Sequence, residues 1–219
     1  AGADLVASSN DDAQASIVYD AVDTMRLLYD PESLDTHRNQ RFIQNRATNS
    51  KVTKLSDRTQ NKEGRNIDKA IVDEAHEMKT NSIVKPIEQS QSIKESPWLI
   101  IISTEGFVAD GFFDEELAKC RKIIYGEDDS PAGERTLPWL YTQDSEQEVW
   151  DTNEDGINPN WEKSNPSIGR VKKWSYLRDR VDEARKSKSD RVFVMCKDFN
   201  FKQNTAVAWL NYEDYMYLQ

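Results

Sequence analysis

Two short runs of apolar residues along the chain predict strands of a buried sheet. They lie at residues 70–72 and 98–102, and both lead directly into polar residues, while residues 5–8 form a further short strand-like run. Strands buried on both faces of a parallel sheet carry continuous apolar residues, whereas half-exposed strands alternate apolar and polar residues. The pattern therefore predicts an α/β fold with a mainly parallel sheet, in which functional groups gather just beyond the carboxyl ends of the strands.

Longer segments with an apolar residue at every third or fourth position predict helices. The predicted helices cover residues 12–28, part of 78–96, 112–125, 173–186 and 190–198. The first of them follows the run Ser-Asn-Asp-Asp, whose side chains can cap a helix.

Weaker patterns predict a few more elements. Residues 41–43 and 51–55 are expected to pair as a hairpin, and residues 137–141 are expected to form a further strand. The segment 146–169 is acidic at first and then rich in Trp, Pro and Asn, so it is expected to be an ordered but irregular connection.

The composition limits the classes of function. The 219 residues suffice for one sizeable α/β domain, alone or with an appendage, and the net charge of −10 argues against a stand-alone protein held on DNA by static phosphate contacts. The two cysteines, Cys120 and Cys196, form no metal-binding or redox motif and are expected to be reduced thiols of a cytoplasmic protein. The longest apolar run, residues 98–102, is far too short to cross a bilayer.

The first candidate site is the sequence Ala-Ile-Val-Asp-Glu at residues 70–74, which sets two carboxylates at the end of an apolar strand. In P-loop ATPases such a strand end, called Walker B, supplies one acid for the Mg²⁺ and a second group that orients the attacking water. The simpler interpretation is a strand that ends in solvated acids. Asp73 and Glu74 are therefore candidates that need support from a second motif.

That second motif is Ser103-Thr104-Glu105-Gly106, which follows the next apolar strand. Hydroxyl groups at this position can sense the γ-phosphate of ATP and pass its loss to moving parts. Taken alone, the motif is better explained as a cap for the following helix. Two buried strands that both end in polar motifs, however, suit neighbouring strands in a P-loop ATPase sheet of the additional-strand class.

A helicase is a rival interpretation, because residues 73–76 spell Asp-Glu-Ala-His, as in DEAH-box helicases. Ser103 and Thr104 then fall about where those helicases carry Ser-Ala-Thr. The simpler interpretation of His76 is a residue that bonds nearby backbone, and the distant His37, the other histidine, leaves it no metal-binding partner.

Several segments together resemble the ATPase region of tailed-phage terminase large subunits, and this resemblance favours a terminase over a helicase. The similar segments are residues 12–15, 71–74, 103–106, 111–113, 138–141, 161–169 and 209–215, together with the surroundings of Asn200. The most specific is residues 161–169, Trp-Glu-Lys-Ser-Asn-Pro-Ser-Ile-Gly, which is similar to the family's Trp…Asn-Pro-Ser-Leu-Gly.

The resemblance implies roles for the motif residues. Asp73 would hold Mg²⁺ through water, Glu74 would activate the water that attacks ATP, and Ser103, Thr104 and Gly106 would couple hydrolysis to movement. Glu105 stands where the family usually has a small residue, and it is the next candidate for the catalytic acid. The implied cofactors are Mg²⁺ and ATP. The implied partners are double-stranded DNA, a small terminase subunit and a portal ring, at the procapsid in the host cytoplasm.

One motif of that family is missing from the sequence. No Gly-x-x-x-x-Gly-Lys-Ser/Thr loop occurs, and the family places this loop before the part of the protein that the chain resembles. We therefore expect a P-loop ATPase sheet that is incomplete at its N-terminal side, inactive by itself and prone to self-association. The expected divisions are an ATPase core fragment at 1–145, a helical and irregular subdomain at 146–208, and the start of a linker toward a nuclease domain at 209–219.

Two alternatives stay open. One is a piece of a DEAH-box-like helicase, which would continue into a second ATPase-like domain, whereas a terminase continues into a nuclease domain. The other is a non-catalytic interaction module derived from an ATPase, which the acidic charge and the missing loop favour. An in-frame Gly-Lys-Ser/Thr loop upstream would decide against this module.

Overall fold

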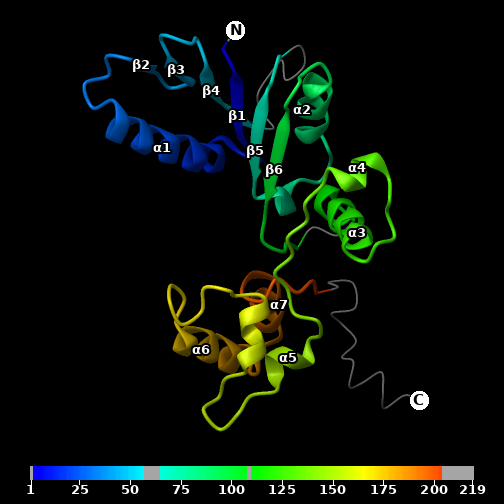
Figure 1. Cartoon of the computed structure of the whole chain (residues 1–219). Coiled ribbons are helices and arrows are strands. Elements are labelled where there is room, and N and C mark those ends of the chain that lie inside the picture. Colours follow the sequence, from blue (N-terminus) through cyan, green and yellow to red (C-terminus); the bar gives the residue numbers. More distant parts are fainter. Residues whose placement is uncertain (1, 57–64, 108–109, 204–219) are drawn as a thin grey trace. The chain divides into compact units, whose positions relative to one another are not determined.

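The computed structural model describes residues 2–56, 65–107 and 110–203, and the chain folds into two compact units (Figure 1). The first unit ends at Ser103 and the second begins at Thr104. This boundary differs from the one expected near residue 145. The expected linker at 209–219 lies outside the described residues.

The first unit is built on one six-stranded sheet in the order β2-β3-β4-β1-β5-β6. The strands are β1 (Asp4–Ser9), β2 (Thr36–Arg38), β3 (Phe42–Asn45), β4 (Lys51–Ser56), β5 (Lys69–Asp73) and β6 (Trp98–Ile102). β4, β1, β5 and β6 pair in parallel, while β2, β3 and β4 pair antiparallel. This confirms both the mainly parallel sheet and the expected hairpin, which is formed by β3 and β4.

The helix α1 (Asp12–Tyr29) begins where the sequence predicts it. The side chain of Asp11 accepts hydrogen bonds from the backbone N–H groups of Ala13 and Gln14, at 2.7 and 3.0 Å, and so caps the first turn. Ala15 and Tyr19 are buried on the face that contacts β1 and β4. The helix therefore covers part of the parallel sheet through a narrow apolar stripe.

Between β5 and β6 the chain forms a short 3₁₀ turn, η1 (Ala75–Glu77), and the helix α2 (Val84–Gln91). α2 contacts β5 and buries Val84, Ile87 and Gln91. The amide of Gln91 donates to the carbonyl oxygen of Trp98 at 2.9 Å, which ties the end of α2 to the start of β6.

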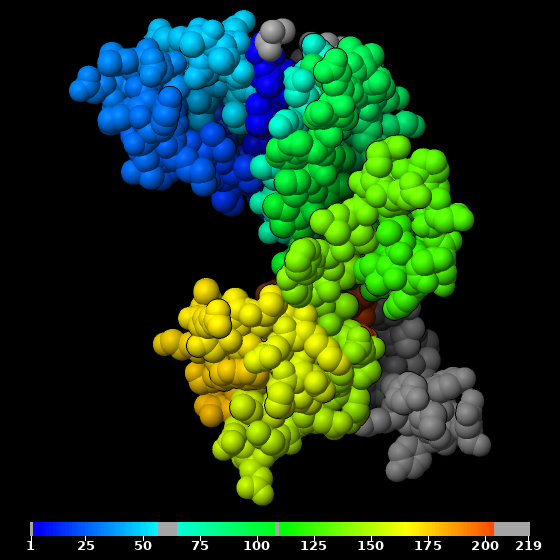
Figure 2. Space-filling model, viewed as in Figure 1, coloured from blue at the N-terminus to red at the C-terminus, as the bar shows by residue number. Residues whose placement is uncertain are grey.

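The second unit is helical in its described part. Its elements are α3 (Phe112–Ile124), α4 (Pro131–Glu134), α5 (Gln147–Trp150), η2 (Pro159–Lys163), α6 (Trp174–Ala184) and α7 (Lys188–Lys197). α3, α6 and α7 confirm three predicted helices. In Figure 2 the colours run from blue to green along the first unit and from green to orange along the described part of the second.

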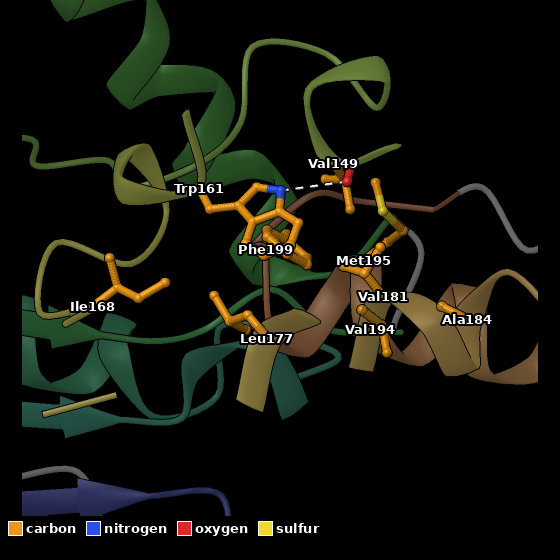
Figure 3. Close-up of a cluster of buried hydrophobic side chains, with 9 residues drawn as sticks. All are labelled: Val149, Trp161, Ile168, Leu177, Val181, Ala184, Val194, Met195 and Phe199. Carbon is orange, nitrogen blue, oxygen red and sulfur yellow. Dashed lines mark hydrogen bonds between the residues drawn. The ribbon is translucent and has the colours of Figure 1, made fainter. Parts of the chain in front are cut away.

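A single apolar cluster, here called the helical core, holds α5, η2, α6 and α7 together (Figure 3). Its buried residues are Val149, Trp161, Ile168, Leu177, Val181, Ala184, Val194, Met195 and Phe199. Trp161 is fully buried, and its indole N–H donates to the carbonyl oxygen of Val149 at 3.3 Å. The segment most specific to the family resemblance therefore has a structural reason to begin with tryptophan.

The expected strand at residues 137–141 is wrong. The described chain has no regular structure there, and Leu137 and Trp139 are 83 % and 70 % exposed. An apolar run forms a strand only where a neighbouring strand accepts its hydrogen bonds, and the described part of the second unit contains no such strand.

Two further expectations concern the cysteines and membrane-spanning segments. Cys120 is a half-buried free thiol and Cys196 a buried one, as the sequence predicts. Among the described residues, no helix has the length and apolar character that crossing a membrane requires.

Candidate functional site at the ends of two parallel strands

The register of β5 and β6 brings the two sequence motifs to one edge of the sheet. The strands run in parallel with Lys69 opposite Trp98 and Asp73 opposite Ile102. The chain therefore leaves both strands at the same level, and Glu74 and Ser103 are the first residues beyond them. This confirms that the two apolar runs are neighbouring strands with their polar ends together.

Asp73 closes β5 and is held by its backbone. The hydroxyl of Ser9, the last residue of β1, donates to the carbonyl oxygen of Asp73 at 2.9 Å. The Oδ1 atom of Asp73 accepts the N–H of Glu74, also at 2.9 Å. The carboxylate thus has a fixed position at the carboxyl edge of the sheet, between the ends of β1 and β6.

Glu74 has a left-handed backbone, with φ 54° and ψ 45°. Few residues other than glycine adopt this conformation, and it costs on the order of 1 kcal/mol. Its effect is local: the chain turns sharply out of β5 into η1, and the Oε2 atom of Glu74 lies 3.0 Å from Nδ1 of His76. Strained backbone of this kind gathers at functional sites, which supports a role for Glu74 beyond solubility.

His76 connects the two strand ends. Its side chain is only 8 % exposed, its backbone N–H donates to the hydroxyl of Ser103 at 3.0 Å, and its Nδ1 lies 3.0 Å from the same oxygen. The sequence suggested a histidine bonding nearby backbone, or a helicase motif. It did not predict a contact with Ser103. The only signal for this contact was the spacing Asp-Glu-Ala-His ahead of a second strand that ends in serine.

The rest of the second motif belongs to the second unit. Glu105 is 5 % exposed, and its Oε1 accepts the N–H of Gly106 at 3.0 Å. Burial raises the pKa of the Glu105 carboxyl, while the Gly106 N–H and the ammonium of Lys202 act in the opposite direction. A buried acid was not predicted here. The signal for it in the sequence was that Glu105 stands where terminase large subunits usually have a small residue.

The carboxylates at this edge of the sheet can be compared with the ligands that the implied Mg²⁺ would require. The described residues contain no group of three His, Cys, Asp or Glu side chains that could hold a metal ion. Mg²⁺ in nucleotide-hydrolysing proteins is bound by one or two carboxylates, waters and substrate phosphates, so a full protein cage is not required. The single carboxylate of Asp73 at the strand end fits that mode of binding.

No model of a protein family matches this sequence, and no curated protein matches it. Among solved structures, the chain is similar to the large terminase of bacteriophage HK97, with a TM-score of 0.73 and 17 % identity over 92 % of this chain and 40 % of that one. It also matches the large terminase ATPase domain of Thermus phage P74-26, with a TM-score of 0.39 and 21 % identity over 49 % of this chain and 50 % of that one. The chain thus spans less than half of the HK97 protein, and it has the fold of the corresponding part of that large terminase.

Proposed function

We propose that this chain is part of an ATP-driven DNA-packaging motor of the large-terminase type, which moves double-stranded DNA into a procapsid. One observation carries the proposal: two parallel strands end side by side in Asp-Glu and Ser-Thr, within a fold like that of the HK97 large terminase. In P-loop ATPases, groups at this edge of the sheet carry out hydrolysis and respond to it.

In this proposal Asp73 and Glu74 have separate tasks. Asp73 would hold Mg²⁺, because its carboxylate closes the strand and its backbone is fixed by Ser9. The bound Mg·ATP supplies the phosphoryl group that is transferred to water. Glu74 would take up the proton of the attacking water, and its left-handed backbone marks the point where the chain turns out of β5.

Ser103, Thr104 and Gly106 are the coupling residues of the proposal. Ser103 contacts His76 just after Glu74, so a shift at the end of β5 reaches the start of the second motif. The small terminase subunit and the portal ring are the proposed protein partners, and the host cytoplasm is the proposed location.

The coding sequence upstream of this chain gives the first test, since the proposal requires an in-frame Gly-Lys-Ser/Thr loop there. The enzymatic test compares Glu74→Gln with Asp73→Ala in the complete gene product. Glu74→Gln is expected to lower phosphate release by about 10²–10⁴-fold and to leave ATP binding intact, because an amide cannot accept the proton. Asp73→Ala is expected to weaken binding of Mg·ATP.

Glu77→Gln is the matched control, because Glu77 lies in the 3₁₀ turn that directly follows Glu74 and has no proposed part in the chemistry. Wild-type turnover by Glu74→Gln would refute the assignment of Glu74, and Glu105 would become the next acid to test. An upstream sequence without the loop would favour a non-catalytic interaction module.

A further inference from the structure

We propose that Lys197 and Asn200 are positioning residues that clamp residues 105–107 onto the end of α7. Through this clamp, a displacement of the segment that follows β6 is transmitted to the helical core. The transmission role rests on the proposed motor function. The clamp itself does not, because all of its contacts lie within the second unit.

Glu105 is held by both of its backbone polar groups. The Nζ of Lys197 donates to its carbonyl oxygen at 3.1 Å, and its own N–H donates to Oδ1 of Asn200 at 3.3 Å. Lys197 is the last residue of α7, and Asn200 follows three positions later. One short stretch of chain therefore fixes the peptide groups on either side of Glu105.

The side chain of Glu105 adds a second anchor. Besides accepting the Gly106 N–H, its Oε1 lies 3.7 Å from Nζ of Lys202, and that ammonium also pairs with Asp114 of α3. A buried carboxylate is unfavourable unless charge or hydrogen bonds compensate it. The buried carboxylate of Glu105 is therefore compensated only while the chain from Lys197 to Lys202 packs against it. A small uncharged residue at position 105 would not need this compensation.

Asn200 cannot move independently of the helical core. Its backbone is left-handed, with φ 49°, a conformation that asparagine tolerates better than most residues. Its Nδ2 donates to the carbonyl oxygen of Tyr141 at 3.1 Å, and its own carbonyl oxygen accepts the hydroxyl of Thr142 at 2.7 Å. On either side, Phe199 is a member of the helical core and Phe201 packs against it.

Lys197 extends the clamp to Phe107. Its ammonium lies 5.4 Å from the centre of the Phe107 ring, and that ring lies 6.2 Å from the ring of Phe193, also on α7. Such cation–aromatic contacts are favourable at distances up to about 6 Å. The segment is thus held at residues 105 and 107 by groups that α7 or the chain just beyond it supplies.

The clamp is tested by amide hydrogen exchange at Glu105 and Gly106, measured by NMR on this chain. Lys197→Met and Asn200→Gly are each expected to accelerate exchange of the Glu105 amide by about tenfold or more. In each variant one hydrogen bond that local opening must break in the unaltered chain is absent, so opening costs less free energy. Glycine keeps the left-handed backbone of residue 200 available, so only the side-chain contacts are lost.

Lys188→Met is the matched control, since Lys188 is an exposed lysine at the other end of α7 and should leave exchange at Glu105 unchanged. Amides within α6 report on the helical core and should also keep their rates in all variants. Unchanged exchange at Glu105 in both clamp variants would refute the clamp, as would an equal acceleration throughout α6. This measurement of amide exchange does not depend on the binding or release of ATP.

The transmission role is tested in the complete gene product. Lys197→Met is expected to retain ATP hydrolysis while DNA translocation per ATP hydrolysed falls several-fold. Equal losses of hydrolysis and translocation would overturn the transmission role. Complete inactivity of the unaltered protein would instead refute the proposed function, while the exchange results would still decide whether the clamp exists.

Discussion

The Nδ1 atom of His76 lies 3.0 Å from the hydroxyl oxygen of Ser103, so the ends of β5 and β6 are joined by side chains as well as by backbone pairing. The same nitrogen lies 3.0 Å from Oε2 of Glu74. Since the His76 ring is nearly buried, it has little freedom to leave these partners. Any change at Glu74 therefore reaches Ser103 through one side chain.

This contact predicts an energetic coupling between His76 and Ser103. We expect His76→Ala and Ser103→Ala each to destabilise the chain, and the double variant to lose about 1 kcal/mol less than the two single losses added together. Urea unfolding at pH 7 measures all three. Pairing His76→Ala with Ser92→Ala, a serine near the end of α2 whose hydroxyl donates to the carbonyl oxygen of Gln89 in its own turn, is the control and should be additive. Additivity for His76 and Ser103 as well would contradict the contact.

The sheet was largely predictable from the sequence for a physical reason. Strands in the middle of a parallel sheet bury both faces, so residues 70–72 are continuously apolar and appear in β5, while the strand-like run at residues 5–8 appears in β1. β2 was missed because it has only three residues, Thr-His-Arg, and depends on its partner β3 rather than on its own pattern. Residues 137–141 failed in the opposite way, since apolar composition alone does not supply a pairing strand.

The candidate site was predictable only in part. Asp73, Glu74 and Ser103 could be selected because parallel strands bring their carboxyl ends to one edge. The left-handed backbone of Glu74 and the burial of Glu105 could not be predicted. Glu105 is held by Asn200, a residue far away in the sequence, and such tertiary contacts leave no local periodicity in the sequence.

The missing loop predicts that this chain does not hydrolyse ATP. The backbone amides and lysine of a P-loop cradle the β- and γ-phosphates, and the sequence has no Gly-x-x-x-x-Gly-Lys-Ser/Thr motif. We expect no phosphate release above background at saturating Mg·ATP, with a known P-loop ATPase as the positive control. Turnover at about 1 per second, an ordinary enzymatic rate, would mean that another group binds the phosphates.

Asp30 predicts a loss of stability in acid. Its carboxylate accepts the hydroxyl of Thr36 at 2.6 Å and the backbone N–H groups of Leu34 and Thr36 at 2.9 and 2.8 Å. The Thr36 hydroxyl is the largest of the effects that lower the pKa of Asp30, and these N–H groups add to it. Because the folded pKa lies below the unfolded one, this stabilisation is complete above the unfolded pKa and is lost as the pH falls through the folded pKa.

We therefore expect Asp30→Asn to unfold at a lower urea concentration than the unaltered chain at pH 7, and the difference to narrow as the pH is lowered toward 3. Asp35→Asn, at an exposed acid in the same loop, is the control and should show a small effect at either pH. A difference of the same size at both pH values would show that the Asp30 bonds do not depend on its charge.

The last prediction concerns the edge of the sheet at β6. Within the described residues β6 pairs only with β5, and its side chains Ile100 and Ile102 are 44 % and 51 % exposed. An apolar edge strand offers unpaired N–H and C=O groups together with apolar surface, and such edges pair with other chains. We expect the chain to self-associate in sedimentation experiments as its concentration rises.

Ile100→Lys should shift this association toward the monomer by about tenfold or more in dissociation constant, because a lysine on the edge must be desolvated when strands pair. Ile93→Lys is the matched control: Ile93 is 79 % exposed but lies just beyond α2, outside the sheet, so it should leave the association unchanged. A monomer at every concentration, with a cooperative high-temperature melt, would show that β6 needs no partner. The chain would then be better described as a self-contained interaction module than as an incomplete ATPase sheet.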